Sequence, residues 1–168
     1  MKFPFRKIAA GSIAAVGLAS VVIHPFGNVK GLDSSTPLLA GSSADFAVLQ
    51  IVDRSCQSCH SEKTRWPWYS YIAPASWMIE NDVRDGRSHM NFSRWSDYPV
   101  EEKRQLLAAI ASAVRNRVMP LPRYVYLHPD ARLSANEINR LYQWTKSERR
   151  RLSVSETPGG EIPTGGGN

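Results

Sequence analysis

Cysteine is nearly absent from this chain, which has 2 cysteines and 4 histidines among its 168 residues. So few thiols exclude a disulfide-stapled scaffold and a zinc site built from two cysteine pairs. Acidic residues are also in the minority, because 15 Asp and Glu stand against 21 Lys and Arg, for a net charge of +6. The charge is mostly spread along the chain and no nucleic-acid recognition module is visible, so we expect no nucleic-acid partner.

Long apolar runs are lacking too, apart from one near the N-terminus. Lys2, Arg6 and Lys7 precede an apolar stretch of 16 residues, Ile8–Ile23, interrupted only by Gly and Ser. A basic start followed by an apolar core is typical of an export signal, so we expect the rest of the chain outside the cytoplasm, in the periplasm or its equivalent. The stretch falls between a signal core and a full membrane span. We favour a retained inner-membrane anchor over a leader cleaved after Ala19.

The two cysteines lie three positions apart and are followed directly by a histidine, in the order Cys56, Cys59, His60. This C-x-x-C-H spacing is the attachment signature of a covalently bound c-type haem. Two thiols one helical turn apart can each bond to one vinyl group of the porphyrin, and the next residue then lies beneath the iron. We therefore predict one covalent haem c, with His60 as the proximal iron ligand.

A disulfide or a thioredoxin-like redox pair is the alternative interpretation of the two cysteines. That interpretation requires the motif at a strand-to-helix junction, and it gives the adjacent histidine no role. No segment of the chain has a convincing strand pattern. The sequence therefore favours haem attachment.

Apolar periodicity predicts an all-α fold. Ser42 or Ser43 is expected to cap the first helix of the domain, which continues through the haem motif. Gly86 is expected to end the second helix, and Ser134 with Glu137 forms a capping box at the start of the last one. The predicted helices cover about residues 43–60, 75–85, 99–117 and 134–150.

Composition divides the chain into four predicted segments. The export signal or anchor is followed by a linker rich in Pro, Gly and Ser, then by the helical domain, and a tail of Pro, Gly, Ser and Thr is expected to be disordered. The corresponding ranges are 1–23, 24–42, 43–151 and 152–168.

Four of the six residues from Trp66 to Tyr71 are aromatic. Aromatic rings can line the edge of a porphyrin, and polar N–H and O–H groups beside them can donate to a propionate. We predict Arg65, Trp66 and Trp68 on the propionate side of the haem. An ordinary aromatic cluster on a loop is the alternative.

Four side chains after the apolar run could supply a second axial ligand. Met119 opens a proline-rich loop before the last helix, and we predict it as the sixth iron ligand. His89, Met90 or no protein ligand are the alternatives. Met78 lies inside a predicted helix and is expected in the core.

Several short motifs lie between residues 45 and 145: Cys56-x-x-Cys59-His60-Ser61, Trp66-Pro67-Trp68-Tyr69-Ser70, Gly86-Arg87, Asn91-Phe92-Ser93-x-Trp95, Met119-Pro120 and Leu127-His128-Pro129-Asp130-Ala131. Together they resemble a bacterial haem-binding domain family whose members look like cytochromes c. The resemblance implies an exported, largely helical, cytochrome c-like domain around one covalent haem. In that fold the first and last helices pack across each other. Phe46 or Leu49 would then contact Leu141, Tyr142 or Trp144.

Axial ligation separates three functions. The prediction is a mono-haem electron carrier with both axial positions filled, and thus a protein that is not an enzyme. The alternative function is a haem-based sensor or peroxidase-like enzyme with an open sixth position, although the chain shows no obvious distal acid–base constellation. The third possible function is structural, in a protein whose haem mainly completes the core. The positive charge is expected to belong to an ordinary solvated surface, and steering toward an acidic redox partner or an anionic lipid surface is the alternative.

Overall fold

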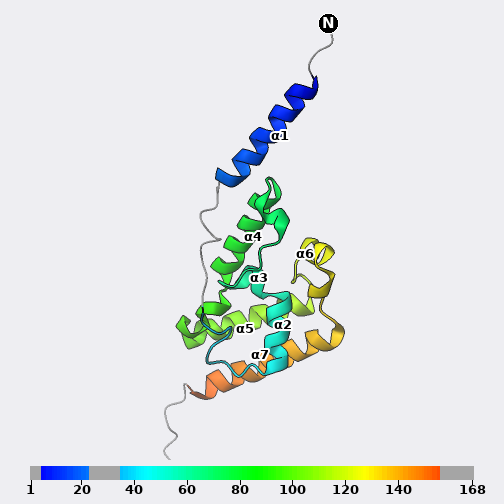
Figure 1. Cartoon of the computed structure of the whole chain (residues 1–168). Helices are drawn as coiled ribbons and strands as arrows, with labels where there is room; N and C mark the ends of the chain where they lie inside the picture. Colours follow the sequence, from blue (N-terminus) through cyan, green and yellow to red (C-terminus); the bar gives the residue numbers. More distant parts are fainter. Residues whose placement is uncertain (1–4, 23–34, 156–168) are drawn as a thin grey trace, which may run out of the picture. The chain divides into compact units, whose positions relative to one another are not determined.

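The computed structural model of the chain describes residues 5–22 and 35–155, and its regular structure is helical throughout (Figure 1). No strand occurs within these two ranges, which confirms the predicted all-α class. The α-helices are α1 (Phe5–Val22), α2 (Phe46–Ser55), α3 (Gln57–His60), α4 (Ala75–His89), α5 (Val100–Arg115), α6 (Pro122–Leu127) and α7 (Ala135–Ser155). Short 3-10 helices are η2 (Trp68–Tyr71), η3 (Phe92–Asp97) and η4 (Pro129–Ala131).

The described residues fall into two compact units, and the chain passes from one to the other after Ala40, within α2 after Ile51, and after Ser96. The first, called the motif unit below, includes residues 35–40 and 52–96 together with α1. The second, called the C-terminal unit, includes residues 41–51 and 97–155. The motif unit thus holds α3 and α4, and the C-terminal unit holds α5, α6 and α7.

The core of the motif unit is small and includes buried apolar residues of α2, α4 and η3. Val83 of α4, Val52 at the end of α2, and Phe92 and Trp95 of η3 are each 2% exposed or less. Burying side chains of this size contributes about 1.5–3 kcal/mol each. Val52 lies close to the haem motif in sequence, since Cys56 comes four positions after it.

The predicted linker over residues 24–42 is wrong at its C-terminal end. Leu39 is only 2% exposed, and its backbone N–H donates to the Phe92 carbonyl at 3.0 Å. Burial of this leucine offsets the entropy of ordering its neighbours, which composition alone did not indicate. Residues 24–34 of the predicted linker lie outside the described part.

In the C-terminal unit, α5 packs along α7. Leu107 and Val114 of α5 and Leu141 and Trp144 of α7 are at most 6% exposed. The helix predicted over residues 99–117 is confirmed as Val100–Arg115.

The start of α7 is confirmed and its end is not. The Ser134 N–H donates to the Glu137 carboxylate at 2.8 Å, and the Glu137 N–H donates to the Ser134 hydroxyl at 3.3 Å, as a capping box requires. The helix then continues to Ser155, and Leu152 is buried. The prediction of disorder from residue 152 is therefore wrong over 152–155, because packing of an apolar residue extends the helix. Residues 156–168 lie outside the described part.

Asp45, rather than Ser42 or Ser43, caps α2. Its carboxylate accepts the Val48 N–H at 2.8 Å. Ser43 instead donates its N–H and its hydroxyl to Glu148, a completely buried carboxylate of α7. Burying the Glu148 carboxylate without hydrogen-bond donors would cost free energy, so Ser43 donates to it. The N-terminus of α2 does not need Ser43, because Asp45 already accepts a hydrogen bond there.

The described side chains of α1 are exposed. Over residues 5–22 and 35–155, none of the helices has the length and apolar character needed to cross a bilayer.

Candidate functional site

The C-x-x-C-H motif lies where α2 gives way to the single turn of α3. The Cys56 N–H donates to the Val52 carbonyl at 2.9 Å and so still belongs to the hydrogen-bond ladder of α2. The N–H groups of Cys59 and His60 both donate to the Cys56 carbonyl, at 3.3 and 3.1 Å. The single helix predicted through the motif is therefore broken at Cys56, where φ is −127°. Neither cysteine is part of a disulfide, and the two lie about one helical turn apart.

The Cys56 thiol is held in its protonated form at neutral pH. Burial raises the pKa of Cys56 to about 12, and the neighbouring Cys59 adds to the rise. A thioredoxin-like pair needs the opposite, a thiolate stabilised by a lowered pKa. No strand precedes the motif in the described chain, and no cluster of three or more His, Cys, Asp or Glu occurs there. Within the described residues, neither the redox-pair alternative nor the zinc alternative finds support.

One ring nitrogen of His60 is already engaged. Its Nδ1 lies 3.2 Å from the Met90 carbonyl oxygen. Because a carbonyl only accepts, Nδ1 carries the proton and Nε2 keeps its lone pair. Burial lowers the pKa of His60, which favours the neutral imidazole, and the Phe92 ring lies beside it at 5.9 Å between centroids. A neutral imidazole oriented through Nδ1 is the usual arrangement of a metal-ligating histidine.

Gly86 allows α4 to approach the motif closely. A Cβ at this position would lie 2.6 Å from the Cys59 carbonyl oxygen and 3.1 Å from the carbonyl carbon. The prediction that Gly86 ends the helix is wrong, since α4 continues through it to His89. The glycine is required by this close contact with a neighbouring backbone rather than by a turn.

Hydrogen bonds from α4 hold the segment that follows the motif histidine. Arg87 donates from Nε to the Ser61 carbonyl at 2.8 Å and from Nη2 to Thr64 Oγ1 at 2.9 Å. The Thr64 hydroxyl donates to the Ser58 carbonyl at 2.7 Å, and the Ser61 hydroxyl donates to the Gln57 carbonyl at 2.8 Å. Our sequence analysis gave these side chains no role, because no spacing rule connects Arg87 to residues more than 20 positions earlier.

The side chains predicted on the propionate side lie in the motif unit and differ in exposure. Arg65 is ion-paired with Asp53 at 2.6 Å, and both side chains are largely in solvent. Trp68 is 76% exposed and meets Tyr69 edge-on at 5.7 Å, whereas Trp66 is half-buried. Contact of Arg65, Trp66 and Trp68 with a haem stays a prediction.

The candidate sixth ligands belong to both units. Met119 follows α5 in the C-terminal unit and is 38% exposed. His89 and Met90 lie at the end of α4, where Nδ1 of His89 is 2.7 Å from the Asp85 carbonyl oxygen. Met78 is 49% exposed, so the expectation that it lies in the core is wrong. Iron ligation by Met119, His89 or Met90 stays a prediction.

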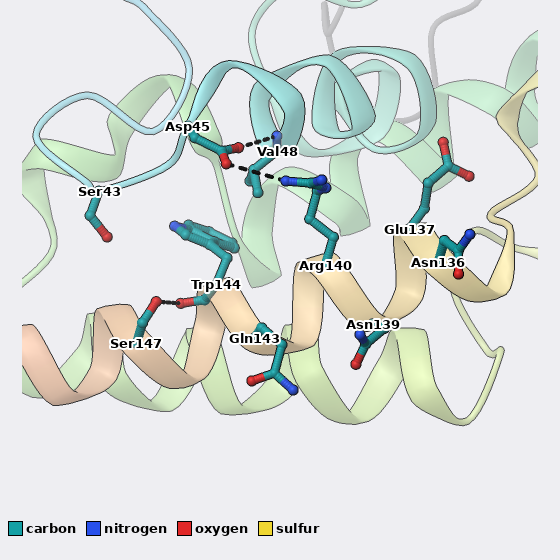
Figure 2. Close-up of a pocket in the computed structure, with 10 residues that line it drawn as sticks. All are labelled: Ser43, Asp45, Val48, Asn136, Glu137, Asn139, Arg140, Gln143, Trp144 and Ser147. Atoms are coloured by element: carbon teal, nitrogen blue, oxygen red, sulfur yellow. Dashed lines mark hydrogen bonds and ion pairs between the residues drawn. The ribbon is translucent and has the colours of Figure 1, made fainter.

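A separate groove of about 760 Å³ lies in the C-terminal unit between the start of α2 and α7 (Figure 2). Asp45 and Arg140 face each other in it at 3.4 Å, and Val48 and Trp144 are its buried apolar side chains. Eight of the ten residues that line it are polar or charged, whereas a typical small-molecule pocket is lined mainly by apolar and aromatic side chains. Phe46 is 75% exposed and does not line the groove, so the predicted packing of Phe46 on α7 is wrong. Leu49, the alternative, is half-buried, and its contact with α7 stays a prediction.

Comparison with known proteins also indicates haem binding. The model of the family described as haem-binding domain matches residues 15–147. Among curated proteins, the cytochrome c peroxidase Ccp of Escherichia coli strain K12 is 24% identical over 157 residues. That match covers 85% of this chain and 33% of the peroxidase, so the chain spans about a third of that protein's length. No solved structure matches the chain.

Proposed function

This chain belongs to the haem-binding domain family, and from that premise we propose that it attaches one haem c covalently and carries electrons. The observation that carries the proposal is the joint geometry of Cys56, Cys59 and His60. Two cysteines outside any disulfide lie about one helical turn apart, and the imidazole that follows them has its Nδ1 proton fixed and its Nε2 lone pair available.

The residues of the motif fit the group that they would hold. Cys56 and Cys59 would form thioether bonds with the two vinyl groups, and Nε2 of His60 would bind the iron from one side. The hydrogen bond from Nδ1 to the Met90 carbonyl fixes the ring orientation and raises the basicity of Nε2. When bound, haem supplies a one-electron iron couple.

Met119 is the proposed sixth ligand, on the strength of its position in the sequence before the proline-rich loop. A soft thioether favours ferrous iron, and a pair of filled axial positions suits a carrier. Peroxidase activity is the second candidate, favoured by the similarity to the E. coli cytochrome c peroxidase. A peroxidase requires an open or displaceable sixth position, so axial ligation separates the two candidates.

The covalent haem is tested first. After expression with a cytochrome c maturation system, haem should stay on the chain in a denaturing gel and in acid–acetone extraction, because thioether bonds survive unfolding. The Cys56→Ser/Cys59→Ser double variant is the matched control and should release any haem it retains. Release of intact haem from the wild type would contradict the proposal.

The electronic spectrum tests the carrier. Oxidised wild type should be low-spin with the weak far-red sulfur-to-iron band, and Met119→Ala should lose that band and have a lower reduction potential. Met78→Ala, which removes another exposed methionine, should keep both. A high-spin wild type that binds carbon monoxide and turns over hydrogen peroxide would overturn the carrier in favour of the peroxidase.

We also propose that the domain functions outside the cytoplasm, in the periplasm. The support is the basic start at Lys2, Arg6 and Lys7, followed by the apolar run Ile8–Ile23. A reporter enzyme active only outside the cytoplasm, fused after Ser155, should be active. Activity of a cytoplasm-only reporter at the same junction would reverse the proposal.

A further inference from the structure

Arg87 is a half-buried cation of α4 whose hydrogen bonds converge on the haem-attachment segment. Its Nε–H donates to the carbonyl of Ser61, the residue directly after His60, and its Nη2 donates to the hydroxyl of Thr64. Burial lowers the pKa of Arg87, but a guanidinium keeps its proton in proteins. The structure therefore holds one permanent positive charge beside the backbone of the proposed axial ligand.

Thr64 and Ser61 extend this restraint to the motif itself. Thr64 donates to the carbonyl of Ser58 and Ser61 donates to the carbonyl of Gln57, so both residues between the cysteines are tied to the segment that Arg87 binds. The neighbouring Gly86 brings α4 against the Cys59 carbonyl. The guanidinium is thus fixed relative to both thiols, unlike a cation on a mobile surface side chain.

We propose that Arg87 positions the haem-attachment segment through its two hydrogen bonds, and that its fixed charge raises the reduction potential of the iron. The inference rests on the proposed function, since it requires a haem on Cys56, Cys59 and His60. Its cause is Coulombic. The ferric centre carries one more positive charge than the ferrous centre, so a fixed cation nearby disfavours oxidation. Reduction takes one electron from an external donor, and no covalent bond forms or breaks.

Neighbouring carboxylates do not cancel this charge. Glu62 is the carboxylate that acts on Arg87, and its side chain is 12% exposed. Its Oε1 already accepts from Arg94 Nε at 2.7 Å and from the Asn91 amide at 3.2 Å. Because Arg94 is paired with Glu62, the cluster of Arg87, Glu62 and Arg94 keeps a net positive charge.

Two substitutions of Arg87 separate charge from geometry. Arg87→Gln removes the charge and keeps a side chain that donates hydrogen bonds, whereas Arg87→Lys keeps the charge and loses the planar fork. Arg84→Gln is the matched control, because Arg84 lies one turn earlier on α4, has an exposed side chain and pairs with Asp85 at 3.0 Å. The readouts are covalent haem per chain and the midpoint potential from a redox titration.

Arg87→Gln is expected to have a several-fold higher ratio of oxidised to reduced protein at the wild-type midpoint potential. Arg87→Lys should stay closer to wild type, and Arg84→Gln should not shift, because solvent and salt screen an exposed charge. Equal midpoint potentials for Arg87→Gln and Arg84→Gln would overturn the proposal. So would an Arg87→Lys variant whose midpoint potential is lowered as much as that of Arg87→Gln.

If Arg87→Gln takes up no haem, the reduction potential of Arg87→Lys tests the proposal instead. A loaded lysine variant with a near-wild-type potential supports the proposal, and a strongly lowered potential overturns it. A wild type without covalent haem would instead refute the proposed function, which the haem measurement detects before any potential is determined.

Discussion

The missing side chain of Gly86 decides how closely α4 approaches the haem motif. An added Cβ would lie 2.6 Å from the Cys59 carbonyl oxygen, a backbone atom that cannot rotate away. Gly86→Ala is therefore expected to lower the free energy of unfolding by about 1–3 kcal/mol, the usual cost of overpacking. Urea denaturation followed by circular dichroism measures the loss.

Gly17→Ala is the control for that substitution. Nothing lies within 4 Å of the position its Cβ would take, and alanine favours a helix over glycine, so its unfolding free energy should not fall. Wild-type stability in Gly86→Ala would show that α4 is not pressed against the Cys59 backbone.

The chemistry of the motif was predictable residue by residue, but its supports were not. The proposed role of Cys56, Cys59 and His60 follows from a local spacing that a sequence displays directly. The acceptor for His60 is a backbone carbonyl 30 residues away, at Met90, and any residue there could supply it. Arg87 likewise becomes significant only once α4 lies against the motif.

The N-terminus of α2 is held by a cap and an ion pair on the same carboxylate. Asp45 accepts the Val48 N–H at 2.8 Å and faces Arg140 at 3.4 Å (Figure 2). Asp45→Ala should lower the free energy of unfolding by about 1 kcal/mol, the typical value of an N-cap. Asp45→Asn keeps a capping oxygen and should lose much less, since an exposed ion pair is worth about 0–1 kcal/mol. Equal losses in thermal or urea unfolding would show that the ion pair, not the cap, stabilises this end.

Helix ends were predictable where both partners are close in sequence. The capping box joins Ser134 to Glu137 within one turn, and it was found from the pattern alone. Ser43 was misassigned because its partner, Glu148, is 105 positions away. The break at Cys56 carries no Gly or Pro signal, and the extension of α7 depends on the burial of Leu152.

Acidification acts on the charge balance of the whole chain. At neutral pH the net charge is +6, and protonating carboxylates removes the negative charges that offset Lys and Arg. One of these carboxylates, Glu148, is completely buried in the C-terminal unit and accepts from Arg151 at 2.6 and 2.7 Å and from Ser43. Burial alone would raise the pKa of Glu148, but the hydrogen bonds from Arg151 and Ser43 outweigh it and the pKa is lowered.

Because the pKa of Glu148 is lower in the folded than in the unfolded chain, its carboxylate stabilises the fold fully above the unfolded value, near 4.5. That contribution is lost as the pH falls through the folded value. Glu148→Gln should be less stable than wild type by about 1–3 kcal/mol at neutral pH, the range for hydrogen bonds to charged groups. The difference should shrink as the pH is lowered below about 4.5, which a series of urea denaturations at stepped pH measures. Glu101→Gln, which alters an exposed carboxylate of α5, should follow the wild-type pH profile. A constant difference between Glu148→Gln and wild type at every pH would show that ionisation of Glu148 does not stabilise the fold.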